Sequence, residues 1–399
     1  MSLLVGILLV LTVVVGIPAF VGIAVFATQI LLHARGGDPD LRPESTPSRR
    51  GPAVVLTPAH NEAAGIARTV TNVRAQLAPG DRMLVVADNC SDDTASLARA
   101  AGAEVVERSS PLRGKGFALA HGMDQLRAAP PAAVVIVDAD CELAPGALGH
   151  LLAELERTGR PVQALYLMLT AGEAKLGRRL AEFAWRIRNW ARPDGWHRLG
   201  LPCQLMGTGM AFSWEMLRDA PLANASIVED MKLGTDLAER GTPPVFCRRA
   251  LVTSHFPDSV QATKTQRTRW EHGHLETIVR EVPRLLARAV ARGDRGLFGL
   301  ALDLAVPPLA VLALLAMVVW VLTAIGVALP GGSGLPFAIA SAMLVAFIGA
   351  VFVAWAVRGR DLVRLGELLA IPWYIAAKLP IYVQFLVRRQ KEWVRTERK

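Results

Sequence analysis

The stretch Val134-Val135-Ile136-Val137-Asp138-Ala139-Asp140 joins four apolar residues to two carboxylates that stand two positions apart. The apolar run predicts a buried β-strand, which places Asp138 and Asp140 at its carboxyl end. Ligands of open α/β sheets bind at that edge, and hard divalent cations prefer carboxylate oxygens. We therefore expect the two acids to hold a divalent cation that bridges a diphosphate. Capping of the helix after Pro145 is the alternative explanation.

Strands and helices are also predicted to alternate in the residues that precede this stretch. Short β-branched runs and amphipathic stretches predict strands at 53–56, 83–87 and 104–106, and helices at 63–77, 92–101 and 116–126. This βαβ order predicts an α/β domain with a mainly parallel sheet. Residues 33–50 are rich in Gly, Pro, Ser and Arg, which indicates a linker before the domain.

Polar clusters follow the first two of these strands. The cluster Thr57-Pro58-Ala59-His60-Asn61-Glu62 follows the first, and Asp88-Asn89-Cys90-Ser91-Asp92-Asp93-Thr94 follows the second, so both fall at the expected ligand edge. Turn formation and helix capping explain many of these polar groups without a ligand. In the second cluster we therefore single out only Asp88, at the end of the strand, as a candidate ligand-binding residue. In the basic turn Arg113-Gly114-Lys115-Gly116, the glycines permit close backbone approach and Lys115 is placed to meet phosphate.

Three later motifs carry further polar groups: Gly207-Thr208-Gly209, Glu229-Asp230 and Gln266-Arg267-Thr268-Arg269-Trp270. Asp230 is expected to begin a helix, where charge–dipole stabilisation is the alternative to a catalytic role. Arg269 and Trp270 taken alone are typical of a membrane-surface anchor. His272 and His274 could be imagined as metal ligands, but we expect no carboxylate or thiolate to pair with them locally and both to be solvated.

Charge is segregated along the chain of 399 residues, which is 52% hydrophobic and contains 44 Lys+Arg and 35 Asp+Glu. Residues 1–32 and 304–357 contain none of these charged types. This pattern excludes a purely soluble enzyme, a disordered chain and a disulfide scaffold. The four cysteines, at positions 90, 141, 203 and 247, lack C-x-x-C spacing, so we expect reduced thiols in the core.

The uncharged segments predict membrane spans. Residues 1–32 are long enough for an N-terminal transmembrane anchor, and 304–357, divided by Pro330-Gly331-Gly332-Ser333-Gly334, predict a transmembrane hairpin. Arginines flank the anchor only on its C-terminal side. The positive-inside rule therefore predicts a multi-pass protein of the cell (inner) membrane whose catalytic domain, at 51–263, is cytosolic.

Basic residues gather beside the expected membrane segments. Residues 264–303, net +3, predict an amphipathic interfacial segment, and 358–399, net +6, an interfacial or re-entrant helix with a basic cytosolic tail. Arginines interleaved with aromatic residues at 173–198 favour a helix on the membrane surface or facing carbohydrate. Because residues 33–263 carry no net charge, the basic excess indicates membrane lipids as partners and argues against nucleic acid.

The motifs resemble, in kind and order, those of the membrane-embedded family 2 glycosyltransferases, which include cellulose, hyaluronan, chitin-oligosaccharide and poly-N-acetylglucosamine synthases. The resemblance covers roughly residues 50–275 and rests on P-A-H-N-E at 58–62, D-N-C-S at 88–91, D-A-D at 138–140, G-T-G at 207–209, E-D at 229–230 and Q-R-T-R-W at 266–270. It implies a GT-A-type nucleotide-sugar-binding domain with N-terminal and C-terminal transmembrane helices.

The resemblance also implies a role for each matched residue. Asp230 would be the general base that takes the proton of an acceptor hydroxyl. The donor would be bound by Thr57, Pro58, Glu62, Asp88, Lys115, Asp138 and Asp140, with Asp138 and Asp140 also holding Mg²⁺ or Mn²⁺. The acceptor and the diphosphate would be lined by Gly207, Thr208, Gly209, Glu229, Gln266, Arg269 and Trp270.

Together these residues predict an inverting, metal-dependent hexosyltransferase. It would move a sugar from a nucleotide-sugar donor, expected to be a UDP-sugar, to a growing polysaccharide or lipid-linked acceptor at the inner face of the membrane. Single-sugar transfer to a membrane lipid and a non-catalytic nucleotide-sensing membrane scaffold are the alternatives. Because three spans are fewer than large synthases use around a polymer channel, secretion is expected to need an export partner or a homo-oligomer.

Overall fold

The computed structural model describes residues 3–42, 51–170, 172, 174–223, 228–257 and 260–387. Part of the expected linker (43–50) and the basic tail (388–399) lie outside the described residues. The chain forms two compact units. The helical unit comprises the residues up to Gly37, Ala174–Gly200 and the residues from His274, and the sheet unit comprises Asp38–Glu173 and Leu201–Gly273.

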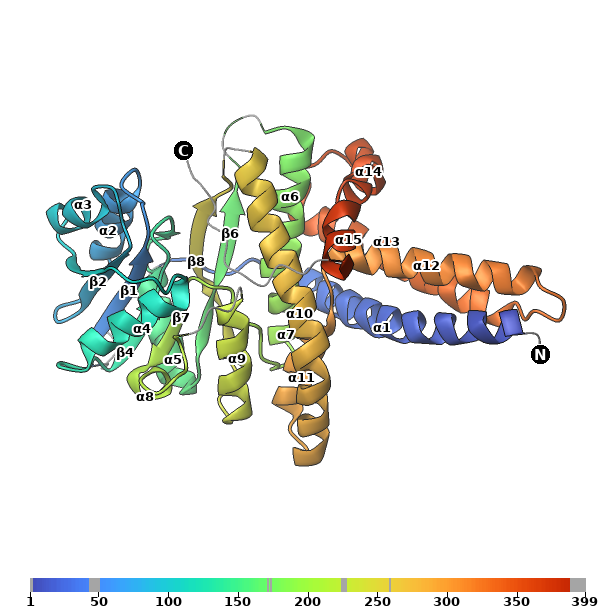
Figure 1. Cartoon of the computed structure of the whole chain (residues 1–399), viewed down its shortest axis with the longest axis horizontal. Coiled ribbons are helices and arrows are strands. Elements are labelled where there is room, and N and C mark those ends of the chain that lie inside the picture. Colours follow the sequence, from blue (N-terminus) through green and yellow to red (C-terminus); the bar gives the residue numbers. More distant parts are fainter. Residues whose placement is uncertain are drawn as a thin grey trace. The chain divides into compact units, whose positions relative to one another are not determined.

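Within the described residues, the sheet unit contains an eight-stranded sheet in the order β3-β2-β1-β4-β7-β6-β8-β5 (Figure 1). The strands are β1 (Ala53–Ala59), β2 (Arg82–Asp88), β3 (Glu104–Arg108), β4 (Ala133–Ile136), β5 (Glu142–Leu143), β6 (Val162–Leu169), β7 (Met210–Ser213) and β8 (Val245–His255). β1 to β4 include the strands expected from the β-branched runs. The aliphatic residues of β1, β2 and β4 are buried because helices cover the sheet, whereas Val105 and Val106 of the edge strand β3 are half-buried.

The sheet is mixed. The strands β3, β2, β1 and β4 are parallel neighbours, as expected, and so are β6 and β8. The neighbouring pairs β4–β7, β6–β7 and β5–β8 are antiparallel. The expected parallel arrangement is therefore found in the N-terminal half of the sheet, where β1, β2 and β4 end in the polar motifs.

The helices of the sheet unit follow their strands closely. They are α2 (Ile66–Arg74), α3 (Thr94–Ala100), α4 (Lys115–Leu126), α5 (Ala147–Thr158), α8 (Trp214–Leu217) and α9 (Glu229–Glu239). The expected helices at 63–77, 92–101 and 116–126 are confirmed, although α2 begins later because the chain before it forms a turn. Asn61 has a positive φ of 54°, and the Glu62 amide donates to Thr94 Oγ1 at 2.8 Å.

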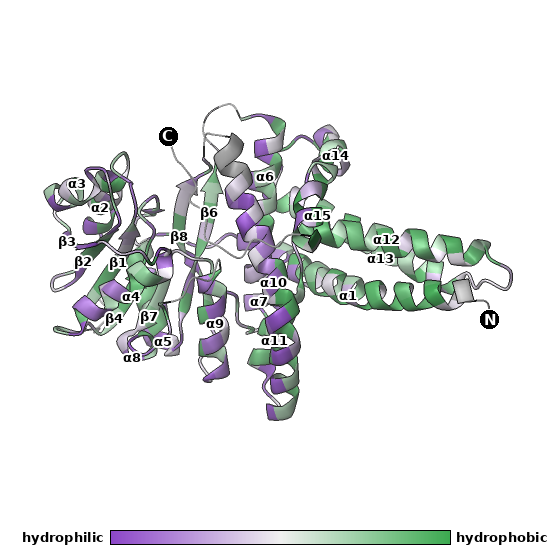
Figure 2. Ribbon diagram, in the orientation of Figure 1, coloured by the Kyte–Doolittle hydropathy of each residue, from purple (hydrophilic) through white to green (hydrophobic). Residues whose placement is uncertain are grey.

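The long apolar helices belong to the helical unit. Helices α1 (Leu3–Ala34), α12 (Leu309–Ala328) and α13 (Leu335–Arg358) pack against one another, and their surfaces are apolar along most of their length (Figure 2). The hairpin expected at 304–357 is present, with the turn between α12 and α13. By length and composition, four segments of the described residues suit a membrane span: 6–34, 309–328, 335–358 and 365–385.

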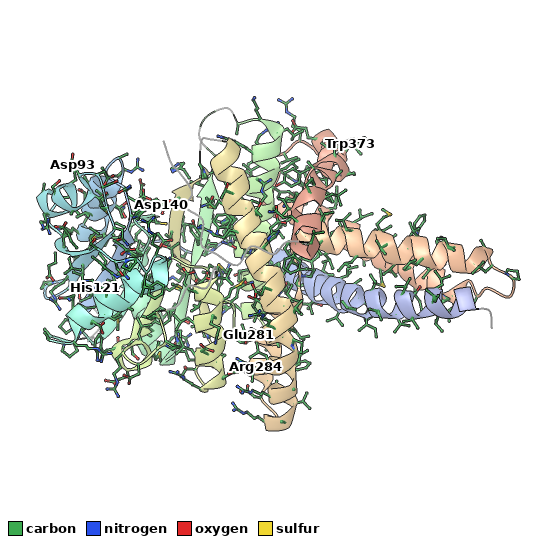
Figure 3. All side chains as sticks on the ribbon, viewed as in Figure 1. Asp93, His121, Asp140, Glu281, Arg284 and Trp373 are labelled. Atoms are coloured by element: carbon green, nitrogen blue, oxygen red, sulfur yellow. The ribbon has the colours of Figure 1, made fainter. Side chains whose placement is uncertain are left out.

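The last of these segments is broken into short helices. These are η2 (Leu365–Ala370), α14 (Ile371–Ala376) and α15 (Leu379–Val387). Pro372 lies in the first turn of α14, where its missing amide hydrogen costs nothing, and Pro380 lies at the start of α15. Trp373, labelled in Figure 3, is 78% exposed.

Residues 174–198 of the expected arginine-rich segment belong to the helical unit rather than to the sheet unit. The segment forms α6 (Leu176–Arg186), the π-helix η1 (Ile187–Ala191) and α7 (Arg192–His197). Four of its arginines pair with acids of the same unit, in the pairs Arg179–Glu367, Arg186–Asp361, Arg192–Asp303 and Arg198–Asp194. Much of its positive charge is therefore satisfied inside the protein.

Two expectations about reactive side chains need revision. His272 and His274 were expected to be solvated, but both are buried. They lie on α10 (Val260–Arg292), whose residues are divided between the two units, and α10 is followed by α11 (Arg295–Ala305). Burial, aided by two arginines, lowers the pKa of His274 to about 3, so its ring stays neutral. Among the cysteines, three are buried as expected and Cys90 is only half-buried, all with free thiols.

Candidate active site

The two carboxylates after β4 lie at the carboxyl edge of the sheet, as the sequence predicts. The Asp138 amide donates to Thr208 Oγ1 at 3.0 Å, which fixes the chain just beyond the strand. Carboxylate oxygens of Asp138 and Asp140, together with Cys141 Sγ, lie within 4.8 Å of one another (Asp140 is labelled in Figure 3). Burial and the two neighbouring acids raise the pKa of the Cys141 thiol, so the charged ligands at this point are oxygens.

Lys115, the first residue of α4, contacts the residues at this edge of the sheet. Its Nζ lies 2.5 Å from Asp138 Oδ1 and donates to the Gly207 carbonyl at 2.6 Å. Burial lowers the pKa of Lys115, but the carboxylates of Asp138, Glu229 and Asp230 outweigh that effect and hold it above its ordinary value. Lys115 is therefore a fixed positive charge among acids, although these residues are far apart in sequence.

Glu229 and Asp230 form the first turn of α9, as predicted. They line a cleft together with Lys115, Gly116, Leu119, Met210, Pro221, Leu222, Lys232, Leu233 and Asp236. Burial and repulsion from Asp230 raise the pKa of Glu229 to about 7. The cleft thus contains the Asp230 carboxylate beside the Glu229 carboxyl group, which keeps its proton up to about pH 7. This arrangement favours proton transfer.

The Gly207-Thr208-Gly209 turn directly precedes β7 and lies close to Asp230 and Lys115. Gly207 has a φ of +90°, and a Cβ built on it would lie 3.4 Å from Asp230 Oδ2 and 3.7 Å from Lys115 Nζ. The backbone therefore approaches both charged groups at a position that favours glycine. A Cβ on Gly209 would lie 2.7 Å from Ala164 Cβ, so that glycine is required by sheet packing.

Gln163 is a supporting residue that the sequence reasoning missed. This fully buried side chain of β6 donates to the Thr208 carbonyl at 2.9 Å and accepts from the Met206 amide at 2.7 Å. Both bonds hold the turn that presents Thr208 to Asp138. The only sequence signal was a glutamine inside an otherwise apolar strand, since a buried amide needs partners.

The predicted donor-binding residues of β1 and β2 also lie at the carboxyl edge. Thr57 is buried, and its Oγ1 has no hydrogen-bond partner among the described residues. Pro58 is in register with Val86 of β2, and Glu62 follows at the turn. Asp88 ends β2, mostly buried, and is ion-paired with Arg108. The sheet therefore brings the ends of β1, β2 and β4 to one edge.

The residues of the last motif lie on α10. Gln266 is buried, and Arg269 and Trp270 are half-buried. They are not among the described residues that line the cleft at Lys115, Glu229 and Asp230. Their expected contact with the acceptor or the diphosphate stays a prediction.

Comparison with known proteins relates this arrangement to one enzyme class. The chain is 37% identical over 123 residues to uncharacterized glycosyltransferases of Mycobacterium bovis and Mycobacterium tuberculosis, a match that covers 29% of this chain. It spans about half the length of these relatives, namely 52%.

Two solved structures are also similar. A mannosyltransferase from Pyrobaculum calidifontis, in complex with GDP-Man and Mn²⁺, aligns with a TM-score of 0.57 at 18% identity, over 96% of this chain and 100% of that one. Glucosyl-3-phosphoglycerate synthase of Mycobacterium tuberculosis, with Mn²⁺ and UDP, covers 59% of this chain and 87% of its own, at 21% identity and a TM-score of 0.38. The first similarity shows that the fold is GT-A.

The family model "Glycosyltransferase like family 2" matches residues 51–273, which is more than half of the chain and includes every candidate site residue described above. With this match on a GT-A fold, the protein belongs to glycosyltransferase family 2.

Proposed function

We propose that this glycosyltransferase is a metal-dependent, inverting enzyme that moves a sugar from a nucleotide-sugar donor to a hydroxyl acceptor. The observation that carries the proposal is the meeting of residues from four motifs that are far apart in sequence. Lys115 joins Asp138 at the end of β4 to the Gly207 turn, and Asp230 approaches the same turn. Inversion requires a base on one side of the sugar and neutralisation of the leaving diphosphate on the other.

The residues at the end of β4 suit a divalent cation. Asp138 and Asp140 offer hard oxygen ligands close together, which are the ligands that Mg²⁺ and Mn²⁺ prefer. The bound cation would neutralise charge that develops on the leaving diphosphate. The Pyrobaculum mannosyltransferase, which shares the GT-A fold, contains Mn²⁺, and this supports the proposed cation.

The chain's own residues would divide the remaining work. Asp230 would accept the proton of the acceptor hydroxyl, and Lys115 would hold a diphosphate oxygen. Thr57, Glu62 and Asp88 would hold the nucleoside at the ends of β1 and β2. Gln163 would keep the Gly207–Gly209 turn in place against Asp138.

A screen of nucleotide sugars tests this proposal. The full chain in lipid is incubated with UDP- and GDP-sugars, with Mn²⁺, Mg²⁺ or EDTA, and released nucleoside diphosphate and product mass are measured. We expect transfer that EDTA abolishes and that Asp140→Asn reduces by at least about 100-fold, because charge neutralisation is lost. Asp124→Asn, an exposed acid on α4, is the matched control. Undiminished transfer in EDTA would contradict the metal requirement.

The acceptor is proposed to be a growing polysaccharide or a lipid-linked glycan at the inner face of the cell membrane. The apolar helices α1, α12 and α13 support a membrane location, and the basic segments favour lipid contact. An export partner or homo-oligomer would complete a secretion path. Cysteine labelling of the intact cell at residues of the sheet unit tests the orientation, because a cytosolic unit is protected from an impermeant reagent.

Single-sugar transfer to a membrane lipid is the second candidate. The exposed apolar side chains of the segment 365–387, including Leu369 and Trp373, favour contact with lipid. Product length separates the candidates, since a polymerase extends its product and a lipid transferase stops after one sugar. The family membership removes support from a non-catalytic scaffold.

A further inference from the structure

Arg108, the last residue of β3, holds a position beside Asp88 that no motif predicted. The two residues are in register across β2 and β3, and Arg108 Nη1 lies 2.5 Å from Asp88 Oδ1. Both side chains are about nine-tenths buried, with exposed fractions of 11% and 9%. An ion pair this enclosed has a fixed geometry, unlike an exposed pair.

The guanidinium of Arg108 is held on several sides. Nη1 and Nη2 each donate to the Leu112 carbonyl at 3.0 Å, and the group lies over the Phe117 ring, 5.7 Å from its centroid. The Arg108 carbonyl accepts from the Asn89 amide at 2.7 Å. The arginine therefore cannot swing away from Asp88 without disrupting the chain that leads to Lys115.

These contacts use only one oxygen of the Asp88 carboxylate. Oδ1 accepts from Arg108 Nη1 and, at 3.2 Å, from Asn89 Nδ2, which occupies both of its lone pairs. Among the described residues, no hydrogen bond to Oδ2 is made. Asp88 thus presents a single acceptor atom, flanked by the fixed donors of Arg108 and Asn89.

We propose that Arg108 makes the protein selective for uridine over guanosine nucleotides, by restricting Asp88 to one acceptor oxygen. The inference rests on the proposed function, in which Asp88 contacts the nucleotide base. Uracil presents one N3–H donor between two carbonyl acceptors, which matches one acceptor beside fixed donors. Guanine presents two adjacent donors, N1–H and the N2 amino group, and needs both oxygens of a carboxylate. Its N2 amino group would stay unsatisfied here, and an unmade buried hydrogen bond is costly.

Arg108 is therefore a positioning residue that acts through Asp88. A purely structural role would affect all nucleotides alike, whereas this role predicts a change in their ratio. Inosine diphosphate is the informative ligand, because its base has the N1–H and O6 of guanine but lacks the N2 amino group. The native protein alone can then test the argument, without any concern that a variant is misfolded.

The experiment measures the dissociation constants of UDP, GDP and IDP for the full chain in lipid with Mn²⁺, by calorimetry. We expect UDP to bind at least about tenfold more tightly than GDP, and IDP to bind severalfold more tightly than GDP. In Arg108→Gln, Oδ1 becomes available, so UDP binding weakens and both ratios fall toward one. Arg82→Gln is the matched control, because Arg82 pairs with Glu104 across the same two strands and is exposed. It should leave both ratios unchanged.

Three results would overturn the inference: GDP binding as tightly as UDP, IDP binding no better than GDP, or equal weakening of all three ligands in Arg108→Gln. The proposed function has a separate readout. Transfer from a guanosine-diphosphate sugar, with preference for GDP, would overturn the inference and leave glycosyl transfer intact. Preferential UDP binding without transfer from any nucleotide sugar would overturn the proposed function and leave the base preference standing.

Discussion

The two units of this protein use the same charged residue types in opposite ways. In the helical unit, Arg192 of α7 donates to Gln29 Oε1 of α1 at 2.8 Å and to Asp303 Oδ1 of α11 at 3.0 Å, and Gln29 also donates to Asp303 at 2.7 Å. All three side chains are buried. Opposite charges here are matched and enclosed.

In the sheet unit, like charges are gathered along a cleft instead. Asp138, Glu229 and Asp230 surround Lys115, and repulsion between Asp230 and Glu229 contributes to the raised pKa of Glu229. Matched charges serve stability, because removing one partner leaves the other buried and unpaired. Gathered like charges oppose stability and are expected where a cation or a proton must be exchanged. Substitutions in the two regions should therefore separate stability from activity.

The largest expected loss of stability comes from the matched network. Asp303→Ala leaves Arg192 buried without its acid, and we expect it to lower the free energy of unfolding by about 3–5 kcal/mol. Thermal unfolding is measured for Asp303→Ala and, as the comparison, for Arg99→Ala, each as the purified chain in lipid. Arg99 pairs with Glu107 on the surface, and loss of such a pair costs less than about 1 kcal/mol. Equal effects of the two substitutions would show that the network contributes no more than a surface pair.

A smaller loss of stability, accompanied by a loss of activity, is expected from Gly207→Ala. Gly207 and Gly241 share nearly the same φ, +90° and +92°, but only Gly207 has Asp230 and Lys115 within 4 Å of an added Cβ. Both alanine variants should lose about 1 kcal/mol of stability from backbone strain. Only Gly207→Ala should also reduce transfer, by at least about tenfold, through displacement of charged groups. Equal turnover in the two variants would show that the Gly207–Gly209 turn is not part of the active site.

A third expected effect is a change in the pH dependence of stability. The unfolded chain ionises Glu229 near its ordinary pKa of 4.5, whereas the folded chain keeps the proton to about pH 7. Ionisation of Glu229 therefore opposes folding increasingly as the pH rises through this window, and the cost is constant above it. Glu229→Gln removes the cost, so its Tm minus that of the native chain should grow between pH 4.5 and 7.

Parallel Tm curves for the two proteins across that pH range would contradict the assignment. Glu215→Gln provides the control, since Glu215 is an exposed acid on α8.

Local patterns predicted the parts of the fold and the site that depend on neighbouring residues. A β-branched run that ends in Asp138 and Asp140 predicts both a strand and its ligand edge, and the structure confirms the strand and the edge. Asp230 was likewise expected to begin a helix and does so in α9. In each case, the residues that cause the strand or the helix to form lie within a few positions of the motif.

Such local patterns do not predict contacts between segments that are distant in sequence. The arginines at 173–198 looked like a surface for lipid or carbohydrate, yet Arg192 pairs with an acid more than 100 residues away. Gln163 and Thr208 meet only because β6 and β7 are neighbours in the sheet. The burial of His274 depends on α10 packing within the helical unit, where the Leu304 carbonyl lies 3.3 Å from its Nε2. Pairing of this kind follows from tertiary structure alone.

The role of Asp230 is tested by comparing Asp230→Asn with Asp219→Asn, since Asp219 is an exposed acid of the same unit. Turnover of the preferred nucleotide sugar and the dissociation constant of its nucleoside diphosphate are measured for both. If Asp230 is the general base, Asp230→Asn lowers turnover by about 10²–10⁴-fold and leaves nucleotide binding within about twofold of the native value. Turnover in Asp230→Asn equal to that of Asp219→Asn would show that Asp230 is not the general base.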